Sequence, residues 1–378
     1  MRVALSFPGC HRQGGVERVL YECARYLASR DHEVMVFASE WGPDDLGPVE
    51  RRHVRIRQHP SFLRGLSYRR ESARQLRHAS FDVLNTHGCV CPEGGVHWVQ
   101  SVHKAWLERS QEFRPRFSGA WARQRMNPAH PLLLAMEARH FRSRTYKKLI
   151  VTTERVRDDL NRLYGVPADD VVIIPNGFSP EEFSPERRRQ RRGEARRRLG
   201  LEAGEIVMLF VANELERKGF TTVLSAMRLL GRSDLRLLVV GRVDASQARA
   251  QAAASGIDAR VDVHGPSDDI ALFHAAGDLL VLPTQYEAFS LAILEALGSG
   301  VPVVTTNVPG ASDAIRPGVN GFLVEHPGDA DGLASVLESL CDERTRRTLS
   351  KGAPGTVEDH QWPSILRRYE RVLMEHRT

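Results

Sequence analysis

Runs of consecutive apolar residues, alternating with helix-like stretches, are the feature of this sequence that most constrains its fold. Examples are VALSF (3–7), EIVMLFVA (205–212) and VPVVTT (301–306). Continuous apolar strands that alternate with helices are typical of parallel sheets with both faces covered. The sequence therefore predicts an α/β fold built from doubly wound parallel sheets.

The apolar runs fall into two groups, which are too many strands for one such sheet. The break between the groups is PNGFSPEEFSPE (175–186), which is rich in proline and turn residues. A chain of 378 residues also favours two domains. We predict an N-terminal domain over 1–174, a C-terminal domain over 175–361, and a final helix over about 362–378 that packs back on the first domain. Ligands of such sheets bind at the carboxyl ends of the strands, so two facing domains would share a cleft there.

Composition excludes some classes of protein and leaves others open. No stretch approaches eighteen uninterrupted apolar residues, so no transmembrane helix is predicted. The first fifteen residues are interpreted as a strand entering a glycine turn, not as a signal peptide. Five cysteines, an odd number, do not suggest a disulfide framework and favour a reducing cytoplasm. The net charge of +6 fits either an arginine-rich genome or an anionic partner.

The segment EAFSLAILEALGSGVPVV (287–304) carries the clearest chemistry. We predict a loop, then a helix that begins near Ser290 and ends at the glycines 298–300. The first helical amides, around Phe289, Ser290 and Leu291, have no acceptor within the helix and lie at the positive end of its dipole. The pattern predicts a site for a diphosphate.

Two glutamates flank those amides. Glu295 lies about five residues into the helix, roughly 7–8 Å along its axis. That length is comparable to the distance from a pyrophosphate to the ribose of the same nucleotide. Glu287 lies on the other side, where a sugar on the far phosphate would be. Carboxylates accept hydrogen bonds from vicinal hydroxyls, so the order Glu287, amides, Glu295 fits sugar, diphosphate and ribose.

These motifs resemble those of the retaining, nucleotide-sugar-dependent glycosyltransferases of the GT-B superfamily, family 4. The resemblance covers nearly the whole chain and, within the family, is strongest to the glucosyltransferases of the lipopolysaccharide core. It implies two facing Rossmann-like domains with a cleft between them. The motifs that carry it are Glu287 and Glu295 with seven residues between them, GGVERV (14–19), DVLNTHG (82–88), LIVTTERVRDDLNRLYGV (149–166), VVIIPNG (171–177), RKGF (217–220), VVG (239–241) and PGVNGFLV (317–324).

Several further residues are predicted to bind the donor. Gly14 and Gly15 follow the first strand and let backbone amides approach a phosphate or the acceptor. Arg217 and Lys218 would hold the diphosphate and neutralise its charge as it leaves. Many relatives carry an arginine where this chain has Asn213, so Arg217 either replaces that cation or is a surface residue. The donor set is Gly14, Gly15, Asn213, Arg217, Lys218, Gly265, Glu287, Ala288, Phe289, Ser290, Leu291 and Glu295.

The resemblance also implies a histidine near the reacting sugar. His103, in VQSVHKAW, fits that histidine, although a histidine at a strand end is often structural. His87 is a second and weaker candidate for lining the cleft. The predicted catalytic residues are therefore Glu287, Lys218, Arg217 and His103.

The expected reaction is transfer of a hexosyl unit, of glucose or N-acetylglucosamine type, from a nucleoside diphosphate to an acceptor hydroxyl. UDP is favoured over GDP as the carrier, and the resemblance implies retention by front-face substitution, with no metal and no other cofactor. The acceptor is left open between a glycan, a lipid-linked glycan and a small aglycone. A GT-B epimerase, a sugar phosphorylase with a pyridoxal cofactor and a non-catalytic basic scaffold remain alternatives, because fold alone does not decide function.

Three tempting motifs are interpreted as structural. His87, Cys89, Cys91 and His97 cluster but match zinc spacing poorly. Asp329-x-Asp331 precedes a helix and is expected to cap it. RRRQRRGEARRR (187–198) lacks interleaved aromatics, so we expect a solvated helical face and no nucleic-acid partner.

The segment 104–148 is basic, contains two tryptophans and interrupts the rhythm of the strands. Such a composition fits a surface that rests on anionic lipid or a lid over the acceptor. We therefore expect a cytoplasmic protein and leave open a peripheral contact with the inner face of the membrane.

Overall fold

The computed structural model describes residues 1–113, 119 and 124–377, and it divides the chain into two compact units. The first unit comprises Met1–Asn176 and Trp362–Thr378, and the second comprises Gly177–Gln361. The chain therefore passes between the units twice, at 176–177 and at 361–362. The first crossing lies two residues beyond the boundary predicted from the sequence.

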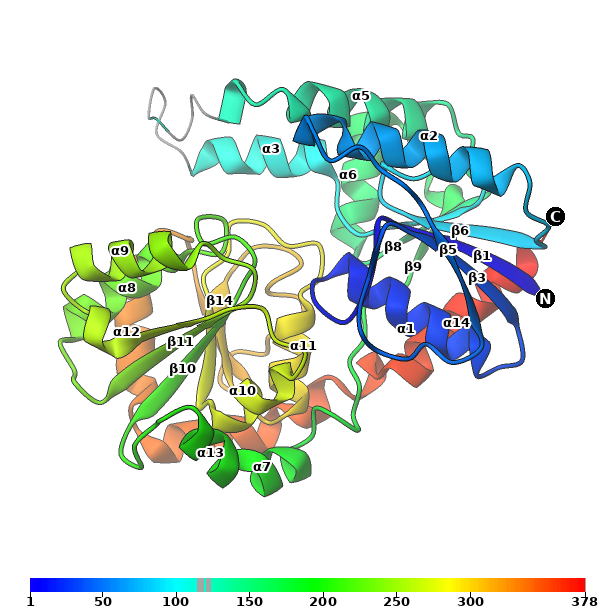
Figure 1. The fold of residues 1–378 in the computed structure, drawn as a ribbon. Helices are drawn as coiled ribbons and strands as arrows, with labels where there is room; N and C mark the ends of the chain where they lie inside the picture. Colours follow the sequence, from blue (N-terminus) through cyan, green and yellow to red (C-terminus); the bar gives the residue numbers. More distant parts are fainter. Residues whose placement is uncertain (114–118, 120–123, 378) are drawn as a thin grey trace. The chain divides into compact units, whose positions relative to one another are not determined.

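The first unit is built on a seven-stranded parallel sheet of order β5-β3-β1-β6-β7-β8-β9 (Figure 1). Its central strand β1 pairs with β3 on one side and with β6 on the other, for example through Val3 with Val34 and Val83. The strands are β1 Arg2–Ser6, β3 Glu33–Ala38, β5 Val49–His53, β6 Val83–His87, β7 Val96–Val99, β8 Lys148–Val151 and β9 Val171–Ile173, and a separate pair is β2 Gly9–Cys10 with β4 Glu40–Trp41.

Helices cover this sheet, because its central strands are apolar on both faces. They are α1 Val16–Ala28, α2 Arg64–Leu76, α3 His103–Glu112, α5 Ala129–Arg142, α6 Glu154–Tyr164 and α14 Trp362–Glu375, with short 3-10 turns η1 Ser61–Leu63 and η2 Ala168–Asp170.

The last helix, α14, belongs to the first unit although it follows the second in the sequence. In Figure 1 it is drawn in red beside the blue helix α1. Glu370 of α14 accepts a hydrogen bond from Tyr26 Oη at 2.9 Å, and His32 Nε2 lies 2.7 Å from its carboxylate. Tyr369, which is fully buried, donates to Asn85 Oδ1 at 2.9 Å. These polar contacts fasten α14 to α1 and β6.

Two buried imidazoles lie together in the core of the first unit. The ring centroids of His97 and His140 are 4.2 Å apart, and each residue is 1% exposed. Thr86 Oγ1 is 2.7 Å from His97 Nδ1, whereas neither ring nitrogen of His140 has a hydrogen-bond partner among the described residues. Burial lowers the pKa of His140 to about 4, with Glu93 opposing the shift and Arg69 adding to it.

We expect this imidazole pair to make the protein sensitive to acid. As the pH falls below the ordinary histidine pKa of about 6.5, the unfolded chain binds protons that buried His140 does not, so stability decreases until about pH 4. His140→Phe should therefore weaken the pH dependence of the free energy of unfolding in this window, measured by urea denaturation. The exposed His78, replaced by phenylalanine, is the matched control. An unchanged slope in His140→Phe would contradict the prediction.

The second unit is built on a six-stranded parallel sheet of order β12-β11-β10-β13-β14-β15. Its strands are β10 Ile206–Val211, β11 Leu235–Val240, β12 Val261–His264, β13 Leu279–Leu282, β14 Val303–Thr306 and β15 Gly321–Val324. Its helices are α7 Pro185–Arg198, α8 Phe220–Leu230, α9 Ala245–Ala254, α10 Ile270–Ala276, α11 Leu291–Gly298, α12 Ala330–Leu340 and α13 Glu343–Gly352, with 3-10 turns η3 Asp258–Arg260, η4 Pro354–Thr356 and η5 Glu358–His360.

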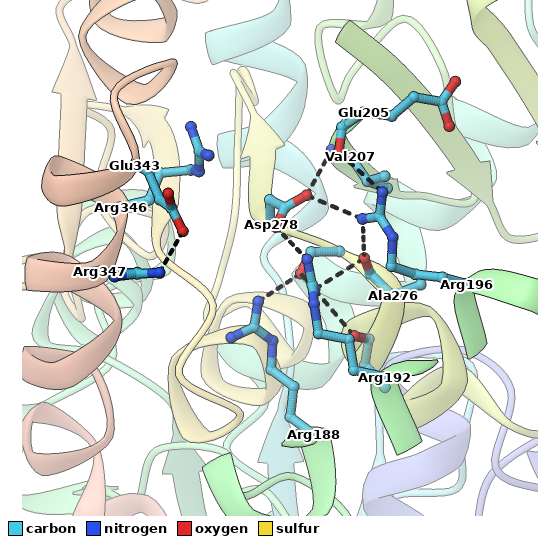
Figure 2. Close-up of polar contacts among 12 residues, drawn as sticks. Arg188, Arg192, Arg196, Glu205, Val207, Ala276, Asp278, Glu343, Arg346 and Arg347 are labelled. Carbon is cyan, nitrogen blue, oxygen red and sulfur yellow. Dashed lines mark hydrogen bonds and ion pairs between the residues drawn. The ribbon is translucent and has the colours of Figure 1, made fainter. Parts of the chain in front are cut away.

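The arginine-rich helix α7 corrects one prediction. Its arginines at every fourth position, Arg188, Arg192 and Arg196, point together at the end of α10 (Figure 2). Arg192 Nη2 donates to Asp278 Oδ1 at 2.7 Å, and Arg188 Nη2 donates to the Gly277 carbonyl at 2.7 Å. The prediction of a solvated face was wrong for these three side chains, because they satisfy the last carbonyls of α10 and an acid beside them.

The prediction for Asp329 is confirmed, since its side chain caps α12 by accepting a hydrogen bond from Gly332 N at 2.8 Å. Among the helices of the described residues, none combines the length and the apolar character needed to cross a membrane.

Candidate functional site

The strand order of the second unit predicts a ligand-binding position between β10 and β13. From β10 the sheet grows through β11 and β12 on one side, and from β13 through β14 and β15 on the other. The loops that follow β10 and β13 therefore diverge at their carboxyl ends, which is where ligands bind in sheets of this type. Arg217 and Lys218 lie in the first of these loops, and Glu287 lies in the second.

Lys218 and Glu287 form an ion pair at this point, 69 positions apart in the chain. Both side chains are about nine-tenths buried. Burial lowers the pKa of the Lys218 ammonium well below its usual value, and the charge of Arg217 lowers it further. A further anion at this site would favour the charged form of Lys218, so Lys218 is suited to bind a diphosphate.

Arg217 supports the same pair. Its Nη1 donates to the Tyr286 carbonyl at 2.8 Å and lies 3.7 Å from Glu287 Oε1. Its Nε also lies 3.2 Å from Glu214 Oε1. Arg217 thus links the two loops and is largely buried, and its part in binding the donor stays a prediction.

Hydrogen bonds to backbone carbonyls fix the loops that follow β10 and β13. Gln285 N donates to the Arg217 carbonyl at 2.8 Å, and Thr284 Oγ1 donates to the Tyr286 carbonyl at 3.1 Å. Gly219 begins α8 with φ +79°, and a Cβ there would collide with the Pro283 carbonyl oxygen. A glycine after Lys218 is therefore required by both the backbone conformation and the close approach of the two loops.

Helix α11 begins at Leu291, with Ser290 as its N-cap residue, as the sequence predicts. The loop that contains Glu287 and Ala288 leads directly into its first turn. Gly310 packs so closely on this loop that a Cβ would collide with the Glu287 carbonyl oxygen. The helix ends before Gly300, whose φ of +69° provides the left-handed stop. The amides of Phe289, Ser290 and Leu291 thus lie at a helix N-terminus next to the Lys218–Glu287 pair.

Glu295 is the fifth residue of α11, just over one turn into the helix, and is 4% exposed. Its Oε2 is 3.8 Å from Nε2 of His274, a buried residue of α10. The structure therefore does not place Glu295 with Lys218 and Glu287 in one cluster. Its assignment to the ribose stays a prediction.

Asn213 and Gly265 lie at the same edge of the sheet, after β10 and β12. Asn213 Oδ1 accepts a hydrogen bond from Arg242 N at 2.9 Å, which joins the loops after β10 and β11. The Gly265 carbonyl accepts a hydrogen bond from Gly241 N at 3.4 Å, which joins the loops after β11 and β12. Asn213 therefore has a structural contact that no sequence pattern indicated.

In the first unit, the corresponding predicted position is where the strand order diverges between β1 and β6. The glycine loop follows β1 and leads into α1. Gly14 has φ +105°, which favours glycine. Gly15 is the N-cap of α1 with an ordinary φ of −94°, and a Cβ there would meet nothing within 4 Å. Gly15 thus leaves open space at a helix N-terminus.

His103 is the first residue of α3 and does not lie at a strand end. Its Nε2 is 3.1 Å from His130 Nδ1, and its ring lies beside Trp106. Burial and, to a smaller extent, the neighbouring His130 together lower the pKa of His103 to about 4. His103 would therefore act as a neutral imidazole near neutral pH.

A buried acid that the sequence analysis missed holds this helix. Glu137 of α5 is 1% exposed and accepts hydrogen bonds from His103 N at 2.6 Å and Lys104 N at 3.0 Å. Tyr164 Oη also donates to it, at 2.5 Å. A glutamate within an apolar helix was the only sequence signal for this contact.

His87 does not line a crevice, contrary to the weaker prediction. It is fully buried, stacks on Trp98 at a centroid distance of 5.7 Å, and lies 2.9 Å from Asn85 Oδ1 through Nε2. Burial lowers its pKa to about 3. His87 is a core residue of the first unit.

Comparison with known proteins agrees with this architecture. Residues 13–182 match the family model Glycosyltransferase Family 4, and residues 191–355 match Glycosyl transferases group 1. The solved structure of WaaG, a glycosyltransferase involved in lipopolysaccharide biosynthesis, superposes with a TM-score of 0.86 at 22% identity, covering 98% of this chain and 99% of that one. Two Rossmann-like units with these matches define a GT-B glycosyltransferase. The chain belongs to glycosyltransferase family 4.

Curated relatives span the chain almost completely. The D-inositol 3-phosphate glycosyltransferase of Acidothermus cellulolyticus is 28% identical, with 99% of this chain and 89% of the relative covered. The lipopolysaccharide glucosyltransferase WaaG of Escherichia coli is 24% identical, with 88% of each covered. The Anabaena protein HepE, solved in complex with UDP and glucose, has a TM-score of 0.76 at 19% identity, covering 99% of this chain and 100% of that one.

Proposed function

We propose that this glycosyltransferase moves a hexosyl unit of glucose or N-acetylglucosamine type from a UDP-sugar to an acceptor hydroxyl and forms an α-glycoside. One observation carries the proposal: Lys218, Arg217 and Glu287 meet at the N-terminus of α11, where strand order diverges. Two cations, a helix N-terminus and a carboxylate are together suited to a diphosphate with a sugar attached.

The proposed reaction breaks the bond between the anomeric carbon and the diphosphate oxygen while the acceptor oxygen bonds to the same carbon on the same face. The acceptor proton passes to a diphosphate oxygen, and the free nucleoside diphosphate leaves. Lys218, Arg217 and the first amides of α11 stabilise the negative charge on the departing diphosphate. Glu287 orients the sugar hydroxyls, and the neutral imidazole of His103 contacts the sugar from the first unit.

Fixed cations and the helix dipole supply the electrostatic stabilisation in this proposal, so we expect no requirement for a divalent metal. Retention is expected because a single face of the sugar is used. The names of two relatives support two acceptor classes. The D-inositol 3-phosphate glycosyltransferase supports a polyol phosphate, and the lipopolysaccharide glucosyltransferase supports a lipid-linked glycan. Complexes of HepE with UDP and with UDP-glucose support UDP as the carrier.

The proposed membrane contact of residues 104–148 stays a prediction. Helices α3 and α5 lie within this segment, whereas residues 114–118 and 120–123 lie outside the described residues.

The first test is thermal unfolding of the protein with UDP, GDP, ADP and TDP. We expect UDP to raise the melting temperature most, since a ligand that binds only the folded state stabilises it. Stabilisation by none of the four would contradict the proposal. Incubation with UDP-glucose and UDP-N-acetylglucosamine, with and without acceptor and in the presence of EDTA, then separates a transferase from an epimerase. Formation of an epimeric sugar nucleotide without acceptor would favour the epimerase.

A further inference from the structure

The two chain crossings of the second unit lie side by side and contact the proposed diphosphate helix. Phe178, next to the crossing at 176–177, donates its N–H to the His360 carbonyl at 2.9 Å. Phe178 and Gln361 also form a parallel bridge. These residues, 178 and 360–361, form a paired segment that we call the crossing pair.

One side chain of the crossing pair reaches the first end of α11. The His360 ring stacks on Phe289, with a centroid distance of 5.4 Å and an interplanar angle of 15°. Phe289 directly precedes the N-cap residue Ser290 and lies within the loop that begins at Glu287. The stack therefore fixes the backbone whose amides are proposed to bind the diphosphate.

The other side chain reaches the far end of the same helix. Phe178 is 3% exposed and belongs to the apolar cluster that includes Ile293, Leu294 and Leu297 of α11. Its ring lies so close to Gly298 that a Cβ there would be 2.8 Å from Phe178 Cδ2 and 2.9 Å from Cζ. A side chain larger than hydrogen at position 298 would displace the ring or the helix.

We infer that His360 and Phe178 are positioning residues that hold the two ends of α11. Through these contacts, binding of a diphosphate at the N-terminus of α11 is coupled to the conformation of the chain at the two crossings. The inference rests on the proposed function of α11 as the diphosphate site. It adds that the crossing pair, at which the chain enters and leaves the second unit, also sets the geometry of that site. Ligand binding at the helix should consequently order the crossing pair, and weakening the stack should weaken ligand binding.

The test distinguishes the contribution of the aromatic ring at position 360, which stacks on Phe289, from the contribution of its polar atoms. His360→Phe keeps an aromatic ring, whereas His360→Gln keeps polar atoms and removes the ring. We expect His360→Gln to raise the KM for the UDP-sugar and the Kd for UDP about 10-fold and to lower kcat, and His360→Phe to stay within about 2-fold of wild type. His326, which is exposed in the same unit, replaced by glutamine is the matched control.

A second measurement does not depend on turnover. UDP should slow hydrogen exchange of peptides covering 176–180 and 357–362 in the wild type, and this protection should be lost in His360→Gln. A role in stability alone predicts a lower melting temperature with unchanged Kd, KM and protection, and that result would overturn the inference. Failure of the wild type to bind any nucleoside diphosphate would instead overturn the proposed function, so the two failures are distinguishable.

Discussion

Replacing Lys218 by methionine is expected to lower kcat about 10²- to 10³-fold, which corresponds to about 3–4 kcal/mol of lost stabilisation of the departing diphosphate. Methionine keeps the unbranched apolar stem and removes the charge, so the buried space is filled. The measurement is initial-rate kinetics with the UDP-sugar that the ligand screen selects.

The exposed Lys351 of α13, replaced by methionine, is the matched control for a change of net charge. Because Lys218 is paired with Glu287, its loss leaves that carboxylate with weaker contacts, to Arg217 at 3.7 Å and to Thr284 Oγ1 at 3.4 Å. The melting temperature of the variant must therefore be measured together with its rate. A well-folded Lys218→Met protein with less than about a 10-fold loss of kcat would contradict the assigned role, given the size expected for such a group.

Replacing Glu295 by glutamine is expected to weaken UDP binding about 10- to 100-fold, because hydrogen bonds to a charged group contribute about 1.5–3 kcal/mol. The effect should fall on the Kd for UDP and the KM for the donor more than on kcat, since the ribose is unchanged by the reaction. Isothermal titration calorimetry with UDP measures it directly.

Glu338, an exposed glutamate of α12, replaced by glutamine controls for the loss of a helical carboxylate. The contact between Glu295 and His274 supplies a competing explanation in which Glu295 serves stability alone. In that case the melting temperature of Glu295→Gln would fall while the Kd for UDP stayed the same, and the ribose assignment would be wrong.

The sequence predicted the strands that are apolar on both faces, because burial of both faces leaves a continuous apolar run. In the two large sheets it missed β5, β7 and β15, and it also missed the two-residue strands β2 and β4. Strand β5, VERRH, is an edge strand with four of its five residues exposed, so it carries no apolar signal. Strands β7 and β15 have four residues each; β7 follows Gly94 and Gly95, and β15 begins with Gly321, and glycines weaken a strand pattern.

The chemistry of the site was more predictable than its contacts. Lys218 and Glu287 each follow a strand, so the sequence placed both at the carboxyl edge of the sheet, but their pairing across 69 positions depends on the order of β10 and β13. The contact of His360 with Phe289 had no local signal, and the contact of Glu137 with α3 was signalled only by a glutamate within an apolar helix. Each of these two contacts joins segments that are distant in the sequence and become neighbours only when the complete unit packs.

The arginines of α7 affect the choice of junctions for chimaeras between enzymes of this family. The group 1 family model begins at residue 191, inside α7, whereas the second unit begins at Gly177. A chimaera joined at 191 would replace Arg192 and Arg196 with those of another enzyme while keeping Arg188 from this one, and all three bind the end of α10. Exchange of the second unit between relatives should therefore use junctions at 176–177 and 361–362, which transfer the helix and its acidic partner together.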